Sequence, residues 1–219
     1  MLRELHFGRR AAKSGQTKSM VVFLHGYGAD GADLLGLADP LAPHLPDTVF
    51  MAPDAPEPCA GNPQGFQWFP IPWLDGSSEA AAAAGLDASA ADLNAFLDAR
   101  MRAENLTARQ VAIVGFSQGS MLALHVLPRR TDPVAGIVAF SGKLLRPDAL
   151  DGDAKSKPPV LLVHGDQDPM VPFAEMSAAG QALTAAGFET YAHVMKGTGH
   201  GIAPDGLSVA LAFLHDRLA

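Results

Sequence analysis

The stretch "VAIVGFSQGSMLAL" (residues 111–124) places one serine between two apolar segments, and the fold can be worked out from it. Residues 109–115 contain a short β-branched run, which predicts a buried strand. Residues 118–127 have a helical pattern, and Pro128 stops it because proline cannot continue a helix. Ser117 therefore lies in a turn that leads directly from a strand into a helix.

Glycines stand two residues before and two residues after this serine, at positions 115 and 119. Bulky side chains there would clash where the chain reverses sharply, so the pattern G-x-S-x-G favours a strained turn that holds the Ser117 hydroxyl out. The first amides of the following helix have no partner, and its dipole is positive at that end. The amide of Gln118 would therefore meet an oxyanion formed on an attacked carbonyl. The alternative is a tight glycine turn without any chemical role.

Short apolar runs alternate with longer helical patterns over the rest of the chain. Because the runs are apolar throughout and helices separate them, they predict a mainly parallel sheet with helices on both faces. We find no internal repeat and no second composition regime, which predicts a single domain over residues 1–219. The further strands are expected at residues 20–26, 47–53, 134–142, 158–165 and 189–197, and the helices at 77–102, 173–187 and 204–218, with a broken helical pattern in "GADLLGLADPLAPHL".

The composition excludes several classes of function. The chain has 219 residues, of which 48% are hydrophobic, so one sizeable core can be buried. The formal net charge is −7 and basic residues are scattered, which argues against a nucleic-acid partner. No run of about eighteen apolar residues exists, so we expect no stable membrane insertion. A single cysteine, Cys59, suits a reducing compartment, and the N-terminal residues lack a signal-peptide pattern, so we expect a cytoplasmic protein.

Residues 54–76 are rich in proline and glycine, which predicts a long irregular insert. Its centre, "QGFQWFPIPWL" (64–74), is too aromatic for a disordered segment. Loops of this length inside a compact domain are usually functional or disordered. The sequence therefore predicts a functional loop here.

A serine nucleophile needs a base, and the base needs a carboxylate that orients it. In folds with this turn the acid follows a later strand and the histidine comes last in the chain. "VLLVHGDQDPMVP" (160–172) offers Asp166 and Asp168 just beyond a predicted strand. Asp166 directly follows a glycine and is expected to bond its own turn. Asp168 lies farther out and is favoured as the acid.

The chain has eight histidines, and one of them lies where the base is required. His200 is in "GTGHGIAPD", a glycine-rich loop between the last strand and the last helix. For His25 and His164, which end strands before a glycine, a structural role is the better interpretation. A second oxyanion donor is expected in the loop after an early strand, "FLHGYGADG" (23–31), where the amide of Tyr27 is the candidate. The alternatives are a surface histidine and a plain turn.

Taken together, the chain resembles the carboxylesterase/phospholipase family of small α/β-hydrolases, which includes the acyl-protein thioesterases. The resemblance rests on "VVFLHGYGADG", "GFSQGSMLAL", "VLLVHGDQDPMVP", "GTGHGI" and the aromatic pair in "FQWFPI", in this order over nearly the whole chain. It implies an α/β-hydrolase fold with about seven strands and without a large lid domain. It also implies a triad of Ser117, Asp168 and His200, an oxyanion hole from the amides of Tyr27 and Gln118, and no metal or organic cofactor. The chain departs from the family at Tyr27, where members often have leucine, and at Ser120, where they often have glycine.

The activity expected from this resemblance is that of a serine carboxylesterase acting on short to medium acyl esters. An acyl-protein thioesterase or a lysophospholipase is the alternative, and a catalytically inactive small-ligand receptor is a rival from another class. The partner is thus a small-molecule ester or thioester. We expect the acyl chain to contact apolar side chains of the long insert. The alternative, which fits these residues equally well, is that they pack over the hydrophobic core. An exposed part of the insert is also compatible with a self-association surface, such as that of a homodimer. The candidates for contact with the acyl chain are Phe66, Trp68, Phe69, Ile71, Trp73 and Leu74.

Overall fold

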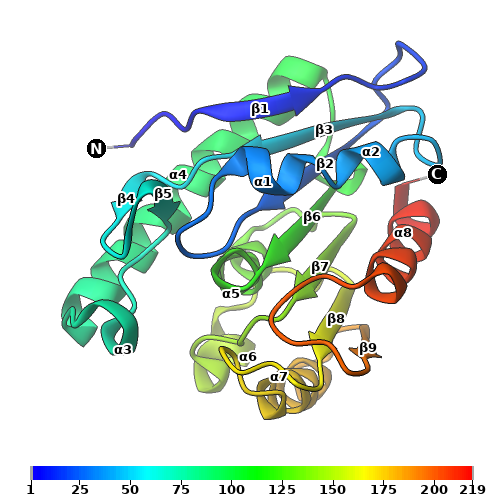
Figure 1. Cartoon of the computed structure of the whole chain (residues 1–219). Helices are drawn as coiled ribbons and strands as arrows, with labels where there is room; N and C mark the ends of the chain where they lie inside the picture. Colours follow the sequence, from blue (N-terminus) through cyan, green and yellow to red (C-terminus); the bar gives the residue numbers. More distant parts are fainter. Residues whose placement is uncertain (1, 219) are drawn as a thin grey trace.

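The structure, a computed structural model, describes residues 2–218 and contains one central sheet of seven strands (Figure 1). The order across the sheet is β1-β3-β2-β6-β7-β8-β9. All neighbouring strands are parallel except β1 and β3, which run antiparallel. The strands are β1 (Phe7–Arg10), β2 (Ser19–Leu24), β3 (Thr48–Pro53), β6 (Val111–Phe116), β7 (Gly136–Phe140), β8 (Val160–Gly165) and β9 (Thr190–Met195). The prediction of a mainly parallel sheet is confirmed.

Helices cover both faces of this sheet, each over its own hydrophobic cluster (Figure 1). Each parallel strand sends alternate side chains to the two sides, so Ile113 packs in one cluster and Val114 in the other. This explains why the strands are apolar along their whole length. One face carries α1 (Gly31–Leu35), α2 (Ala38–Leu41) and α8 (Pro204–Leu218), and the other carries α4 (Glu79–Glu104), α5 (Gln118–Val126), α6 (Leu150–Asp153) and α7 (Ala174–Ala185).

The long insert is more ordered than the sequence predicts, so the expectation of an irregular segment is wrong. It contains a two-stranded antiparallel sheet of β4 (Glu57–Cys59) and β5 (Asn62–Gln67), followed by the short helix α3 (Pro72–Asp75). Each strand of the hairpin contains one proline, which makes the strand pattern hard to recognise in the sequence. A hairpin of this kind has edges on both sides, and proline is tolerated at edges because no ladder hydrogen bond is lost there. Figure 1 shows the hairpin and α3 at one side of the sheet, beside the first half of α4.

Strand β1 is also absent from the sequence prediction. Its four residues end in two exposed arginines, so the apolar signal of a buried strand is missing. It pairs antiparallel with β3 at the edge of the sheet, where polar side chains are common. Its Arg9 reaches Glu104 of α4 across 2.9 Å.

The other predicted strands and helices lie within a few residues of their predicted positions, whereas the short helix α6 was not predicted. Ser78 caps α4 by accepting a hydrogen bond from the amide of Ala81, as its place before an acidic first turn suggests. The broken helical pattern after Asp30 becomes the two short helices α1 and α2, with Gly36 between them. Three short 3-10 helices lie at Ala108–Gln110, Leu127–Arg129 and Pro147–Ala149. Over residues 2–218, no helix combines the length and the apolar character needed to cross a bilayer.

Candidate active site

The turn between β6 and α5 has the strained geometry that its sequence predicts. Ser117 has φ 53° and ψ −115°, a conformation that a residue other than glycine rarely adopts. A Cβ atom on Gly115 would lie 2.5 Å from the amide nitrogen of Ser120, and one on Gly119 would lie 1.9 Å from the carbonyl oxygen of Leu24. Both contacts are too short for any side chain, so the two glycines permit the turn.

Ser117 lies at the carboxyl end of the central strand β6, the usual place for a site in a parallel sheet. Its amide donates a hydrogen bond to the carbonyl of Phe140 at the end of β7, at 2.9 Å. Its own carbonyl accepts from the amide of Met121 at 3.1 Å and so begins the helix. The residue is half-buried, which leaves part of it open to solvent.

Asp168 is buried in the loop after β8, and both of its carboxylate oxygens are hydrogen-bonded. Oδ1 accepts from the amides of Met170 and Val171, at 2.8 and 2.9 Å, while Oδ2 lies 2.7 Å from Nδ1 of His200. Burial by itself raises the pKa of this carboxyl, but the hydrogen bonds from His200 and the two amides lower it below its usual range. The carboxylate is therefore ionised at neutral pH.

His200 comes from the loop between β9 and α8, 32 residues along the chain from Asp168. With Nδ1–H donated to Asp168, the Nε2 atom of the ring is left as an acceptor, which is the tautomer that a general base requires. The imidazole packs on the ring of Phe116, the residue before Ser117, with 4.9 Å between the ring centroids. The structure thus brings the predicted acid and base together, next to the turn that holds the predicted nucleophile.

The other acid and two other histidines have structural contacts. Asp166 accepts a hydrogen bond from the amide of Gly197 at 2.6 Å and so connects two loops. The prediction that its side chain bonds its own turn is therefore wrong. His25 is buried, accepts from the amide of Ala55 through Nε2, and faces the carbonyl of Gly26 through Nδ1. His164 is buried as well, with Nε2 at 2.9 Å from the carbonyl of Val171.

The loop after β2 approaches the nucleophile closely. A Cβ atom on Gly26 would lie 3.3 Å from Cβ of Ser117, which places the following residue, Tyr27, beside the turn. The amide of Gly28 is used in a 2.8 Å hydrogen bond to the carbonyl of Phe66. By contrast, over residues 2–218 the amides of Tyr27 and Gln118 have no hydrogen-bond acceptor. Two free main-chain donors near one serine have the chemistry of an oxyanion hole.

The phenol of Tyr27 extends away from this loop toward the long insert. Its hydroxyl donates to Oδ2 of Asp75, at the end of α3, over 3.4 Å. Burial, together with the neighbouring Cys59 and Asp75, raises the pKa of the Tyr27 phenol. The hydroxyl therefore stays protonated and serves as a donor.

Three of the six insert residues named above line one apolar pocket of about 180 Å³: Phe69, Ile71 and Trp73. The wall also includes Met121 of α5, one turn after Ser117, together with Leu86 of α4 and Leu145. Two charged residues, Glu79 and Arg146, line the pocket as well. Sequence reasoning missed these wall residues. Met121 could have been found from its helical spacing to Ser117, whereas nothing local marks Leu86 or Leu145.

The other three insert residues lie elsewhere. Trp68 is fully buried beneath the site, so we assign it no contact with a substrate. Phe66 is half-buried in β5, where it forms a bridge with Ala29 of the loop after β2. Leu74 is 48% exposed on α3 and lines a separate groove beside Tyr27.

Comparison with known proteins gives the same architecture. Residues 10–218 match the family model described as Phospholipase/Carboxylesterase. The chain is 27% identical to the esterase YpfH of Escherichia coli K12, over 91% of this chain and 82% of that protein. It is 30% identical to acyl-protein thioesterase 1 of Saccharomyces cerevisiae, over 96% of this chain and 98% of that protein.

Among solved structures, the chain is similar to esterase PE8, with a TM-score of 0.94 and 42% identity. This match covers 99% of the present chain and all of the other chain. A strained serine turn, a buried aspartate–histidine pair and an alignment over nearly the whole length agree with one another. The chain belongs to the phospholipase/carboxylesterase family of α/β-hydrolases.

Proposed function

We propose that this protein is a serine carboxylesterase in which Ser117 is the nucleophile, His200 the general base and Asp168 the acid that orients it. The observation that carries the assignment is the 2.7 Å contact between Asp168 Oδ2 and His200 Nδ1, since these two residues meet only in the folded chain. The buried carboxylate holds the imidazole in one tautomer and stabilises its charged form.

The reaction proceeds through an acyl-enzyme. His200 accepts the Ser117 proton as the hydroxyl oxygen attacks the acyl carbon, and the amides of Tyr27 and Gln118 bind the resulting oxyanion. The tetrahedral intermediate collapses, the C–O bond to the alcohol breaks, and His200 gives its proton to the leaving oxygen. Water then repeats the sequence on the acyl-enzyme and releases the acid. Each oxyanion donor is expected to contribute about 3 kcal/mol to the transition state.

The substrate is an ester with a short to medium acyl chain. The pocket that contains Phe69, Ile71, Trp73 and Met121 supports this assignment, because Met121 lies one helical turn from Ser117 and most of the lining side chains are apolar.

The direct test is labelling with a fluorophosphonate, which reacts with activated serines. We expect one labelled site, Ser117, and we expect Ser117→Ala to abolish both labelling and hydrolysis of p-nitrophenyl butyrate. Ser120→Ala is the matched control, because this hydroxyl lies three residues away but is buried and donates to the carbonyl of Phe140 at 2.7 Å. Turnover that survives in Ser117→Ala would reject the assignment.

A second candidate is hydrolysis of thioesters or lysophospholipids, which the likeness to an acyl-protein thioesterase favours. The same three side chains would perform both reactions, so the pocket decides between them. Turnover of an ester and a thioester that carry the same acyl group distinguishes them. A kcat/KM for the thioester at least ~10-fold above that of its ester would make the second candidate the better one.

Further properties follow from the sequence and remain part of this proposal. The single cysteine, buried in the fold, supports a cytoplasmic location. The exposed Trp73 and Leu74 on α3 support self-association as a homodimer. Sedimentation of the wild-type protein and of Trp73→Ser/Leu74→Ser tests the second point, and a monomeric wild type would contradict it.

A further inference from the structure

The side chain of Gln118 makes two buried hydrogen bonds with the main chain of the long insert. Its Oε1 accepts from the amide of Trp68 at 2.8 Å, and its Nε2 donates to the carbonyl of Phe69 at 2.7 Å. The residue has no exposed surface. One amide side chain therefore fixes two consecutive residues of the insert in the way that a neighbouring strand would.

The same loop is held from its other side by α4. The hydroxyl of Ser89, also without exposed surface, donates to the carbonyl of Trp68. The indole Nε1 of Trp68 donates to the carbonyl of His25 at 3.0 Å, directly before the loop that carries Tyr27. Trp68 thus connects α4, α5 and the loop after β2.

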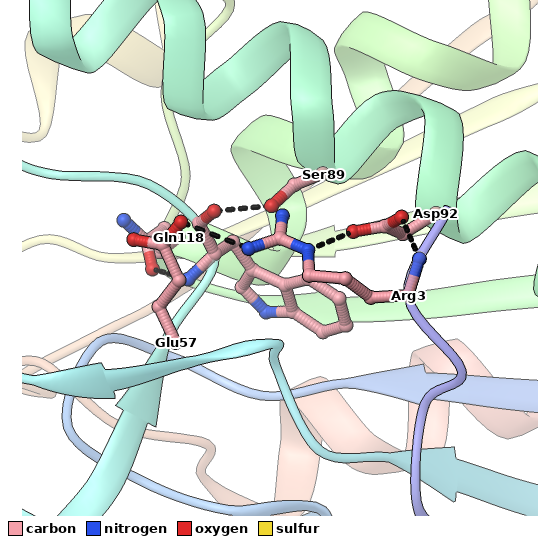
Figure 2. Close-up of polar contacts among 6 residues, drawn as sticks. Arg3, Glu57, Ser89, Asp92 and Gln118 are labelled. Atoms are coloured by element: carbon pink, nitrogen blue, oxygen red, sulfur yellow. Dashed lines mark hydrogen bonds and ion pairs between the residues drawn. The ribbon is translucent and has the colours of Figure 1, made fainter. Parts of the chain in front are cut away.

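An ion-pair network anchors the hairpin that leads into this loop. Arg3 contacts Glu57 of β4 through Nη1 at 2.9 Å and the buried Asp92 of α4 through Nε at 2.7 Å. Figure 2 shows the Arg3 side chain between Glu57 and Asp92, together with Ser89 on the helix above it and the side chain of Gln118. The hairpin and the loop are therefore fixed to α4 at two places, and within residues 2–218 only the Gln118 side chain forms hydrogen bonds between them and the serine turn.

In this arrangement the main-chain amide and the side chain of Gln118 have different roles. In the proposed function its main-chain amide binds the oxyanion. Its side chain holds the loop whose next residues, Phe69 and Ile71, line the apolar pocket. We propose that the Gln118 side chain is a positioning residue that sets the acyl-chain preference, by holding the pocket wall in register with the nucleophile. This inference rests on the proposed function.

The physical reason lies in the burial of the groups involved. Without the Gln118 amide, the Trp68 N–H and the Phe69 carbonyl have no partner in a place that excludes water, which is unfavourable enough to make the loop move. A shift of the loop displaces Phe69 and Ile71, whereas the main-chain amide of residue 118 stays in α5. Long acyl chains, which fill the pocket, are affected more than acetyl groups, which do not reach it.

Gln118→Met tests this separation, because methionine has a similar length and keeps the main-chain amide but cannot form either hydrogen bond. The measurement is the ratio of kcat/KM for p-nitrophenyl hexanoate to that for p-nitrophenyl acetate. We expect this ratio to fall about 10-fold or more relative to wild type. Fluorophosphonate labelling of Ser117 gives the fraction of active protein, to which each rate is normalised.

Gln110→Met is the matched control. Gln110 also makes two side-chain bonds to the main chain, from Thr107 N and to Lys18 O, at 3.0 and 2.9 Å. It lies just before β6, at the opposite end of the strand from Ser117. We expect this variant to lower the melting temperature without changing the ratio.

Ser89→Ala is a second test variant, since it removes the hydrogen bond to the Trp68 carbonyl of the same loop without any change at residue 118. We expect its ratio to fall in the same direction by a smaller factor, and it decides the question if Gln118→Met does not fold. The inference is overturned by an unchanged ratio in folded Gln118→Met, or by an equal fall in Gln110→Met. Failure of the proposed function looks different: wild-type protein is then not labelled at Ser117 or hydrolyses neither ester, which overturns both proposals.

Discussion

The serine turn and the long insert meet at one site, yet they are held in place by different means. The turn between β6 and α5 depends on a close steric fit of the main chain. A Cβ on Gly115 would meet Ser120 in the same turn, and one on Gly119 would meet the Leu24 carbonyl of the neighbouring strand β2. The insert, residues 54–76, depends on partners far along the chain, such as Gln118, Ser89 and Arg3. Steric contacts of the main chain determine the first region, and long-range hydrogen bonds determine the second.

This difference indicates that the proposed reaction chemistry and the proposed substrate preference depend on different parts of the chain, the serine turn and the insert. The turn supplies the proposed nucleophile, Ser117, whose strained main-chain geometry tolerates almost no change. The insert supplies a pocket wall whose position depends on a few buried polar contacts, each of which can be altered singly. Substitutions in the two regions should therefore have effects of different kind and size.

The largest expected effect comes from adding one carbon at the turn. In Gly119→Ala the new Cβ would lie 1.9 Å from the Leu24 carbonyl oxygen, and neither main-chain segment can yield without disturbing the sheet. We expect a loss of about 3 kcal/mol or more in unfolding free energy, and loss of esterase activity. Denaturation by urea and p-nitrophenyl butyrate turnover measure the two effects.

The control for this substitution lies in the insert. A Cβ on Gly61, in the hairpin turn, meets nothing within 4 Å, so Gly61→Ala should leave stability within about 0.5 kcal/mol of wild type. Equal effects at the two glycines would contradict the contrast between a sterically constrained serine turn and an open hairpin turn at Gly61.

The next largest effect should follow from breaking the ion pair that anchors the insert. Arg3→Met leaves the Asp92 carboxylate, of which 2% is exposed, without its cation. Because the Arg3 side chain itself is 34% exposed, we expect a loss of about 2 kcal/mol, less than for a fully buried pair. Thermal and urea unfolding give the value.

Adding Asp92→Asn to Arg3→Met removes the stranded charge and still provides an acceptor for the Arg3 amide, so about half of the loss should return. Arg10→Met is the surface control, since its 3.7 Å pair with Asp39 is exposed on both sides and should contribute less than about 0.5 kcal/mol. A double variant less stable than the single one would argue against a buried charge as the cause.

Acid should affect the helix of the serine turn through His125. Burial, with Arg129 and Arg146 nearby, lowers the pKa of His125 to about 4. The unfolded chain, with a histidine pKa of about 6.5, then binds more protons than the folded chain between these two values. Stability is therefore expected to fall as the pH drops from about 6.5 toward 4, and to show no contribution from this group above that window.

His125→Leu isolates this contribution from that of the carboxyl groups. Between pH 7 and pH 5, the melting temperature of wild type should fall more than that of the variant, by about 3 °C or more. The experiment is differential scanning calorimetry at both pH values. Parallel decreases in the two proteins would show that other groups cause the acid sensitivity.

The smallest effect is expected at the contact between the loop after β2 and the insert. Tyr27→Phe removes the 3.4 Å hydrogen bond to Asp75 but keeps the main-chain amide proposed for the oxyanion. A long hydrogen bond of this kind is expected to contribute less than about 1 kcal/mol, and ester turnover should change less than about threefold. A loss of 100-fold or more would mean that the phenol itself takes part in the reaction.

Most of the fold follows from patterns that are visible in the chain. Apolar runs broken by helical segments predict the parallel sheet, and they do so because each central strand is buried on both faces. The edge strand β1 and the hairpin β4–β5 escape prediction for the opposite reason, since edge positions impose no apolar pattern and tolerate Arg10 or Pro58. Sequence signals are strongest where burial is greatest.

In the candidate site, too, some residues could be predicted from the sequence and others could not. Motif and order in the chain led to Ser117, Asp168 and His200, and the structure joins the last two at 2.7 Å. For the aromatic insert, composition alone could not separate the pocket lining from the core. Trp68 and Phe69 are adjacent, yet the first is fully buried beneath the site and the second lines the pocket.

The sequence by itself determined the sheet, the serine turn and the chain order of the proposed catalytic residues, because each appears in the chain as a short motif or as a repeated apolar pattern. Only the tertiary structure decided which insert residues form the pocket wall. That choice depends on hydrogen bonds from Gln118 and Ser89 to main-chain groups of the insert, and main-chain groups are the same in every residue. No pattern of side chains along the chain can therefore reveal which of them will be bound.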